Sequence, residues 1–112
     1  MDQFIGGLHE VLGPAESAVD KIRLFVDHHL DMVERHPDVA AVISVELRQS
    51  PKFMKEYKNP KFVEYLRTLA ELIVEGMKSG ELRSDMNPWL SARALFGMLD
   101  ELVLAWVVPE WV

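Results

Sequence analysis

The sequence contains no cysteine among its 112 residues. Disulfide bonds, thiolate nucleophiles, cysteine-bound zinc and iron–sulfur clusters are therefore excluded from this chain. It also lacks an apolar run of about 18 residues, the length that a transmembrane helix needs. Its first residues, MDQFIGGLHE, lack the basic and apolar regions of a secretory signal. We therefore expect a cytoplasmic protein with no membrane partner.

Positive charge is also scarce in this sequence. Lys and Arg number 12 against 18 Asp and Glu, so the formal net charge is −6. Because nucleic-acid binding relies on a surface that neutralises phosphates, we do not expect these residues alone to bind DNA. Hydrophobic residues make up 49% and charged residues 27% of the chain, as in a soluble globular domain. The length suits one core, which predicts a single domain over residues 1–112.

Signals for β-structure are absent as well. The sequence has no alternation of polar and apolar residues, no Asn-Gly or Asp-Gly hairpin dipeptide and no internal repeat. Apolar residues recur with helical spacing, and five of the six prolines stand just before amphipathic segments. The pattern predicts an all-α helical bundle of about five to six helices.

Prolines and glycines divide the chain into the expected helices. These helices are predicted over residues 15–36, 37–48, a short stretch from 51, 60–79 and 88–107. Residues 1–12 are predicted to be the end of a connecting helix.

The last predicted helix is apolar almost all round, so it must be covered on two sides. One face should dock on the rest of the domain through Trp89, Ala92, Phe96, Leu99, Val103 and Trp106. The opposite face carries small residues, and the preceding helix has an unusually wide apolar arc. These two surfaces predict a four-helix homodimer interface made of Val63, Ala70, Val74, Ala94, Gly97, Met98, Glu101 and Ala105. The alternative is that both helices are central in a monomeric bundle.

Three stretches, VELRQSPKFMKEY, EYLRTLAELIVEGMKSGELRSD and ARALFGMLDELVLAWVV, resemble the C-terminal domains of TetR-family transcriptional regulators. The strings at 46–50, 75–80 and 99–106 are most similar to the acyl-CoA-responsive branch that controls fatty-acid metabolism. The resemblance implies a repressor domain that binds an effector inside its bundle, forms a homodimer through its last two helices and moves two N-terminal helix-turn-helix heads. DNA would be contacted only through that head. The head is missing from this sequence, which is either a truncation or a headless relative.

Two polar residues fall on apolar faces of predicted helices. His29 lies among apolar residues on the first long helix, and Glu46 lies on the inward face of the next helix. A buried imidazole or carboxylate needs a partner. The two could form a structural network, His29 with Glu46 and Arg93 with Asp100 on the docking side of the last helix, or they could contact a bound effector. The predicted effector pocket consists of Phe25, His29, Met32, Glu46, Met54, Leu69, Ile73, Phe96, Leu99 and Asp100. The apolar members would serve equally well as ordinary core.

Basic residues are concentrated in one stretch of an otherwise acidic chain. From Arg48 to Lys61 there are five basic residues and one acid, and Arg48, Lys52 and Lys55 are candidate contacts for an anionic head group. A solvated charged surface is the alternative.

No metal, cofactor or catalytic activity is predicted. His28 and His29 point about 100° apart on a helix, and no metal-ligand motif accompanies them. The chain has no nucleophile–base spacing and no glycine-rich phosphate loop. We therefore expect a domain that senses a hydrophobic effector, such as a long-chain acyl-CoA. The alternative is a helical dimerisation module without an effector.

Overall fold

The computed structural model describes residues 5–41 and 60–107. The labelled helices are α2 (Leu8–Leu12), α3 (Ala18–Arg35), α6 (Pro60–Ser79) and α7 (Pro88–Val107). Residues 37–41 are also helical, at the start of the predicted second helix. These ranges contain no strand, and the predicted all-α bundle is confirmed. The remainder of the second predicted helix and the short helix after residue 51 lie outside the described residues.

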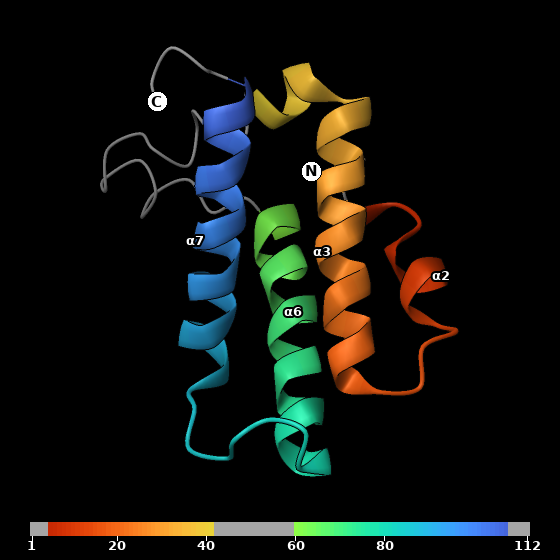
Figure 1. Ribbon diagram of the computed structural model, residues 1–112, viewed down its shortest axis with the longest axis vertical. Helices are drawn as coiled ribbons and strands as arrows, with labels where there is room; N and C mark the ends of the chain where they lie inside the picture. Colours follow the sequence, from red (N-terminus) through yellow and green to blue (C-terminus); the bar gives the residue numbers. More distant parts are fainter. Residues whose placement is uncertain (1–4, 42–59, 108–112) are drawn as a thin grey trace.

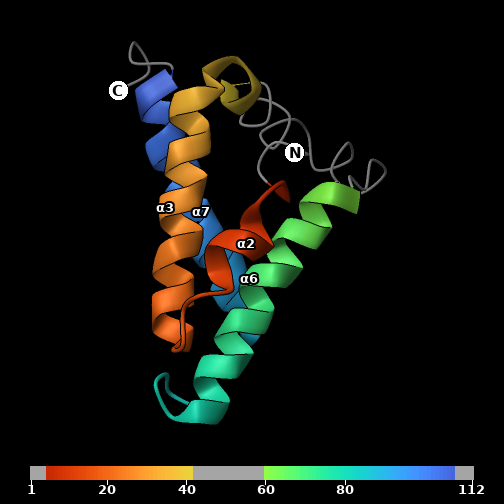
Figure 2. The same ribbon diagram turned by 90° about the vertical axis from the view of Figure 1, so that its right-hand side faces the viewer.

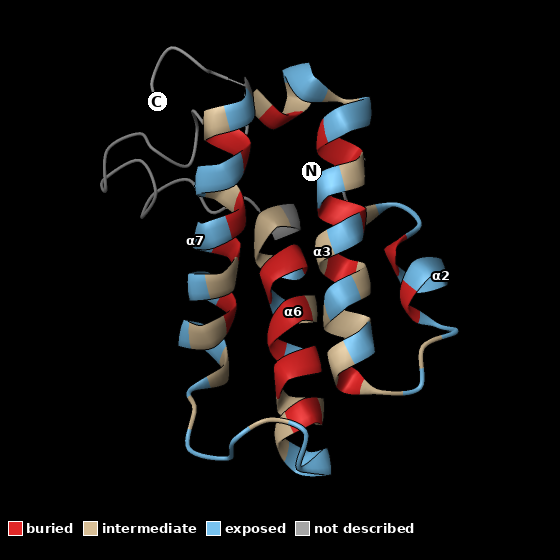
Figure 3. Ribbon diagram, in the orientation of Figure 1, coloured by how far each residue is buried: buried red, intermediate tan, exposed pale blue. Residues whose placement is uncertain are grey.

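Helix α6 is the centre of the bundle and packs against both α3 and α7 (Figure 1). The chain runs up α3, down α6 and up α7, while α2 lies beside α3 on the side away from α7. Figure 2 shows α6 inclined relative to α3, so that the two helices diverge towards the top of the view, while α2 packs against α3. The buried residues of the three long helices face one another across the centre of the bundle (Figure 3).

The core draws large apolar side chains from all four labelled helices. Its fully buried members include Phe25 and Tyr65, both with no exposed surface. The cluster consists mainly of Leu8, Leu12, Phe25, Met32, Val33, Tyr65, Leu66, Leu69, Ile73, Ala92, Phe96 and Val103. Burial of these side chains is the main force that holds α3, α6 and α7 together.

Helix α3 begins three residues later than predicted. Its N-cap is Ser17, whose Oγ accepts a hydrogen bond from the backbone N–H of Asp20 at 3.1 Å. The carboxylate of Glu81 accepts from the N–H groups of Ala18 and Val19, each at 3.1 Å. The first turn therefore starts where its free N–H groups find acceptors, rather than directly after Pro14.

The boundaries of α6 and α7 match the predicted ones. Each begins at a proline, and α6 is followed by Gly80 in a left-handed conformation with φ 85°. The side chain of Asn87 caps α7, because its Oδ1 accepts from the N–H groups of Trp89 and Leu90 at 3.0 and 3.1 Å. These signals are local, so the sequence alone locates both helix starts.

Helix α2 is shorter than the connecting-helix segment predicted over residues 1–12. It starts only at Leu8, because Gly7 adopts a left-handed conformation with φ 78° that interrupts the helix. Its two buried residues, Leu8 and Leu12, join the core.

The predicted docking face of α7 needs one correction. Ala92, Phe96, Leu99 and Val103 are buried, but Trp89 and Trp106 are 44% and 53% exposed. Both tryptophans lie near the ends of the helix, where the described part of the chain places too little structure to cover them.

Candidate functional site

The polar centre of the bundle is a hydrogen bond between His29 on α3 and Tyr65 on α6. His29 Nδ1 and the Tyr65 hydroxyl oxygen are 2.9 Å apart, and both side chains are buried. His29 was expected to need a partner, and Tyr65 supplies one. Tyr65 is not among the site residues predicted from the sequence, although a buried tyrosine hydroxyl itself normally requires a hydrogen-bond partner.

Burial determines the protonation of this pair. Desolvation, with a smaller contribution from the neighbouring His28, lowers the pKa of the His29 imidazole to about 4. Desolvation also raises the pKa of the Tyr65 hydroxyl above its ordinary value. Near neutral pH both groups are therefore uncharged, so the pair offers polar hydrogen-bonding atoms without a buried charge.

An aromatic cluster surrounds the His29–Tyr65 pair. The Phe25 and Tyr65 rings have centroids 4.7 Å apart, and the His29 ring lies 5.7 Å from that of Phe96 in an edge-to-face arrangement. Phe62 closes the cluster with its ring centroid 5.1 Å from Phe96. The cluster joins α3, α6 and α7 at one level of the bundle and fixes the positions of the two polar side chains.

The structure brings most of the predicted effector-pocket residues into one core. The buried members are Phe25, His29, Met32, Leu69, Ile73, Phe96 and Leu99. Asp100 is half-buried at the edge, whereas Arg93, which we had placed on the docking side of α7, is exposed. Glu46 and Met54 lie outside the described residues, as do the candidate head-group contacts Arg48, Lys52 and Lys55.

An apolar groove opens between α3 and α7 towards their C-terminal ends. It encloses about 220 Å³ and is lined by Leu30, Val33, Glu34, Leu102, Val103 and Trp106. The groove was not predicted, although two of the residues that line it, Val103 and Trp106, belong to the predicted docking face of α7. A helical pattern shows that this face turns inward but not that a space remains between it and α3.

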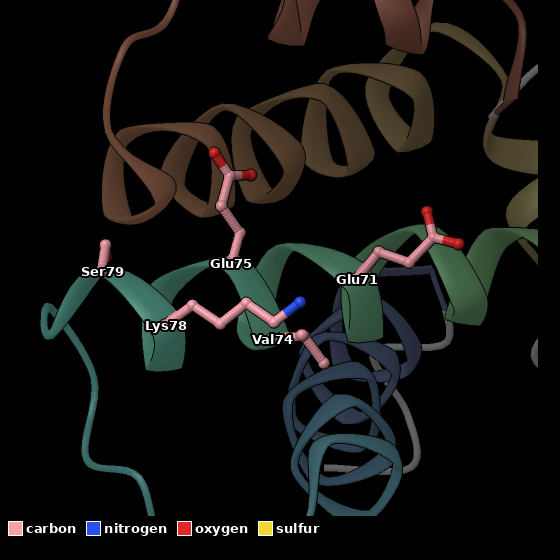
Figure 4. Close-up of a pocket in the computed structure, with 5 residues that line it drawn as sticks. All are labelled: Glu71, Val74, Glu75, Lys78 and Ser79. Carbon is pink, nitrogen blue, oxygen red and sulfur yellow. The ribbon is translucent and has the colours of Figure 1, made fainter.

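A second, shallower hollow of about 480 Å³ lies along α6 (Figure 4). It is lined by Glu71, Val74, Glu75, Lys78 and Ser79. Glu75 points towards α3, where its Oε1 pairs with Lys21 Nζ at 2.9 Å. The residues that line the hollow are mainly charged, so the hollow is a poor match for a hydrophobic effector.

The predicted interface residues of α7 lie on its outer surface. Ala94, Gly97, Met98 and Glu101 are exposed and Ala105 is half-buried. On α6, Val63 and Val74 are half-buried, whereas Ala70 is already covered within the chain. Leu90, 66% exposed, belongs to the same outer surface of α7 and was missed from the sequence. Its signal was its position four residues before Ala94, on the same side of the helix.

The comparison with protein families agrees with this architecture. Residues 1–111 match the model described as "YsiA-like protein, C-terminal region", a C-terminal region of TetR-type proteins. The chain belongs to the TetR family. The resemblance to the C-terminal domains of TetR-family regulators is thus confirmed. The "Fatty acid metabolism regulator protein" of Bacillus subtilis (strain 168) is 31% identical to the chain over 110 residues.

This TetR-family chain covers only part of its relative. The match takes in 98% of the chain but 57% of the Bacillus protein. No solved structure matches the chain significantly. None of the helices within residues 5–41 and 60–107 combines the length and apolarity needed to cross a bilayer.

Proposed function

We propose that this chain is the effector-sensing and dimerisation domain of a TetR-family transcriptional repressor, and that its effector is hydrophobic, such as a long-chain acyl-CoA. The observation that carries the proposal is the 31% identity, over almost the whole chain, to a protein named as a fatty acid metabolism regulator. In the complete regulator, DNA would be contacted by an N-terminal domain. Effector binding would shift the populations of two dimer geometries by binding one of them more tightly.

Two features of the bundle support a hydrophobic effector with a polar group. The apolar groove between α3 and α7 opens close to buried Val33 and Val103, which belong to the same core as the aromatic cluster. Deeper in the bundle, His29 and Tyr65 offer neutral polar atoms in apolar surroundings. A few polar groups within an apolar lining are typical of sites that orient a small molecule.

The second candidate function is a dimerisation module without an effector. It is favoured by the close packing of the aromatic cluster, in which the predicted pocket residues contact one another. In addition, no buried side-chain polar atom lacks a hydrogen-bond partner in the described part of the chain. The buried polar atoms of such a core need no ligand as a hydrogen-bond partner.

A thermal-unfolding titration separates the two candidates. The purified chain is heated with increasing concentrations of a long-chain acyl-CoA, and coenzyme A alone and the free fatty acid serve as matched controls. A specific effector at about one hundred times its Kd should stabilise the fold by about 2.7 kcal/mol. The melting temperature should therefore rise steadily with acyl-CoA and little with coenzyme A. An unchanged melting temperature across several acyl chain lengths contradicts the proposed effector and supports the effector-free module.

A further inference from the structure

Gly97 stands midway along α7, where nothing in the described part of its own subunit requires a glycine. Its φ is not positive, and a Cβ added at this position would meet no atom within 4 Å. By contrast, a Cβ at Gly76 would come within 2.7 Å of Leu82 Cδ1, so that glycine is explained by packing within the chain. Glycine weakens a helix interior. Its presence at an open position indicates that something outside the subunit approaches the α7 backbone closely.

The surface around Gly97 carries exposed apolar residues and two charged residues at equal distances from the glycine. Leu90, which faces nearly the same way as Gly97, is 66% exposed, and Met98, about 100° further round the helix, is 60% exposed. Arg93 and Glu101, both exposed, stand four residues before and four residues after Gly97. At 1.5 Å and 100° per residue, they lie about 6 Å from Gly97 along the axis and about 40° to either side of it. The two opposite charges are thus placed symmetrically about the glycine.

This symmetry distinguishes between the two ways in which α7 could pair with a second copy of itself. In a parallel pair, Arg93 would face the same arginine of the other copy, and Glu101 the same glutamate. In an antiparallel pair with a two-fold axis at Gly97, each Arg93 lies at the same height as the Glu101 of the other copy, on the opposite side of the line of contact. Like charges in apposition repel and opposite charges attract, so only the antiparallel arrangement is self-complementary.

We infer that two copies of α7 cross antiparallel at Gly97, and that the arginine at 93 in each copy pairs with the glutamate at 101 in the other. This inference rests on the proposed dimerisation and adds its axis, its direction and the residues that set its register. The glycine brings the two backbones together, and the exposed leucine at 90 extends the apolar contact beyond the charges.

A charge-swap experiment tests the register. The dimer dissociation constant is measured by analytical ultracentrifugation for the unaltered chain, Arg93→Glu, Glu101→Arg and the double variant. Each single variant turns two attractive contacts into two repulsive ones, and we expect its Kd to rise about tenfold or more. The double variant exchanges the charges and should restore the Kd to within about threefold of the original. Arg23→Glu, on the exposed surface of α3, is the matched control and should leave the Kd unchanged.

The possible failures are distinct. If the chain dimerises but the double variant is no better than the two single variants, the Gly97 register is wrong while the proposed dimer stands. If Gly97→Ala leaves the Kd unchanged, close approach at the glycine is also refuted. A chain that stays monomeric at all concentrations overturns the register and the proposed dimerisation together.

Discussion

At the scale of single residues, His29 links the acid stability of the fold to one proton. Its pKa falls from 6.5 to about 4, chiefly because burial penalises the charged imidazole. Between these two values the unfolded chain binds a proton that the folded chain does not, so the free energy of unfolding falls as the pH falls. Over this pH range the free energy of unfolding falls by roughly 3 kcal/mol, and the fall is complete near pH 4.

Urea unfolding at several pH values between 7.5 and 4.5 measures this loss. The variant His29→Gln keeps a neutral polar side chain at this position but cannot titrate, so its stability should depend less on pH in this window. Exposed carboxylates such as Glu81 contribute equally to both proteins and cancel in the difference. Parallel stability curves for the two proteins would contradict a buried neutral His29.

We expect the hydrogen bond between Tyr65 and His29 to stabilise the fold in addition to the packing of the Tyr65 ring. Tyr65→Phe keeps the contacts with Phe25 and Phe96 but removes the hydroxyl that bonds His29 Nδ1. Leaving a buried polar atom without this partner should cost about 1–3 kcal/mol. In the double variant His29→Leu with Tyr65→Phe, both ends of the bond are removed. Its loss, measured by denaturant unfolding, should be smaller than the sum of the two single losses, and simple additivity would rule out the coupling.

Only part of the His29–Tyr65 pair could be predicted from the helical pattern of the sequence. Spacing places His29 on an apolar face and shows that it needs a partner. It does not reveal which residue of another helix lies at the same height, because that depends on how α6 is inclined relative to α3. The sequence therefore suggested Glu46, Arg93 or Asp100, whereas the described partner is Tyr65.

At the scale of the helices, the loop from Gly80 to Asn87 controls the ends of three elements. Gly80 ends α6, the carboxylate of Glu81 caps the start of α3, and Asn87 caps the start of α7. Backbone hydrogen bonds from Val19 and Ala18, with the hydroxyl of Ser79, lower the pKa of the Glu81 carboxyl. The loop therefore fixes the lower end of the bundle through these hydrogen bonds as well as through Leu82 and Met86, which pack against the core.

Asn87→Ala tests the contribution of one cap. The substitution removes the acceptor for the N–H groups of Trp89 and Leu90, and such a loss typically costs about 1 kcal/mol. Denaturant unfolding should show this decrease, while Asn87→Asp, which keeps an acceptor at the N-terminus of α7, should restore most of it. Ser84→Ala, at an exposed position in the same loop, is the control. A similar loss from both alanine substitutions would mean that the loop, and not the cap, is responsible.

Helix limits were predictable where the cap is next to the helix in sequence, and not where the partner is distant. Pro60, Gly80 and Pro88 gave correct limits because each acts through its own backbone geometry. The start of α3 depends partly on Glu81, which lies 63 positions from Ala18. The N-cap Ser17 is a local signal for the same start, but the expected helix began directly after Pro14.

At the scale of the whole molecule, the described residues leave several large apolar side chains of α7 exposed, among them Leu90, Met98 and Leu102. A helix that is apolar almost all round needs cover on two sides, so the sequence predicts that a partner covers this surface. Trp89 and Trp106 were expected to be buried with the rest of the docking face, and they are exposed because they lie near the two ends of α7, where the described residues do not cover them. A helical pattern identifies a face but not how far the neighbouring elements extend along it.

Leu90→Lys distinguishes a dimer from a monomeric bundle. In a monomer, this already exposed residue should tolerate the change to within about 0.5 kcal/mol, and the melting temperature should not depend on protein concentration. In a dimer, the lysine would be placed in an apolar contact, so the variant should melt at a lower temperature. It should also lose the rise in melting temperature that the unaltered chain shows with concentration. Val11→Lys, at the exposed surface of α2, should retain that rise. If the unaltered chain shows no concentration dependence and Leu90→Lys melts with it, α7 faces solvent, and its exposed leucine and methionine need another explanation.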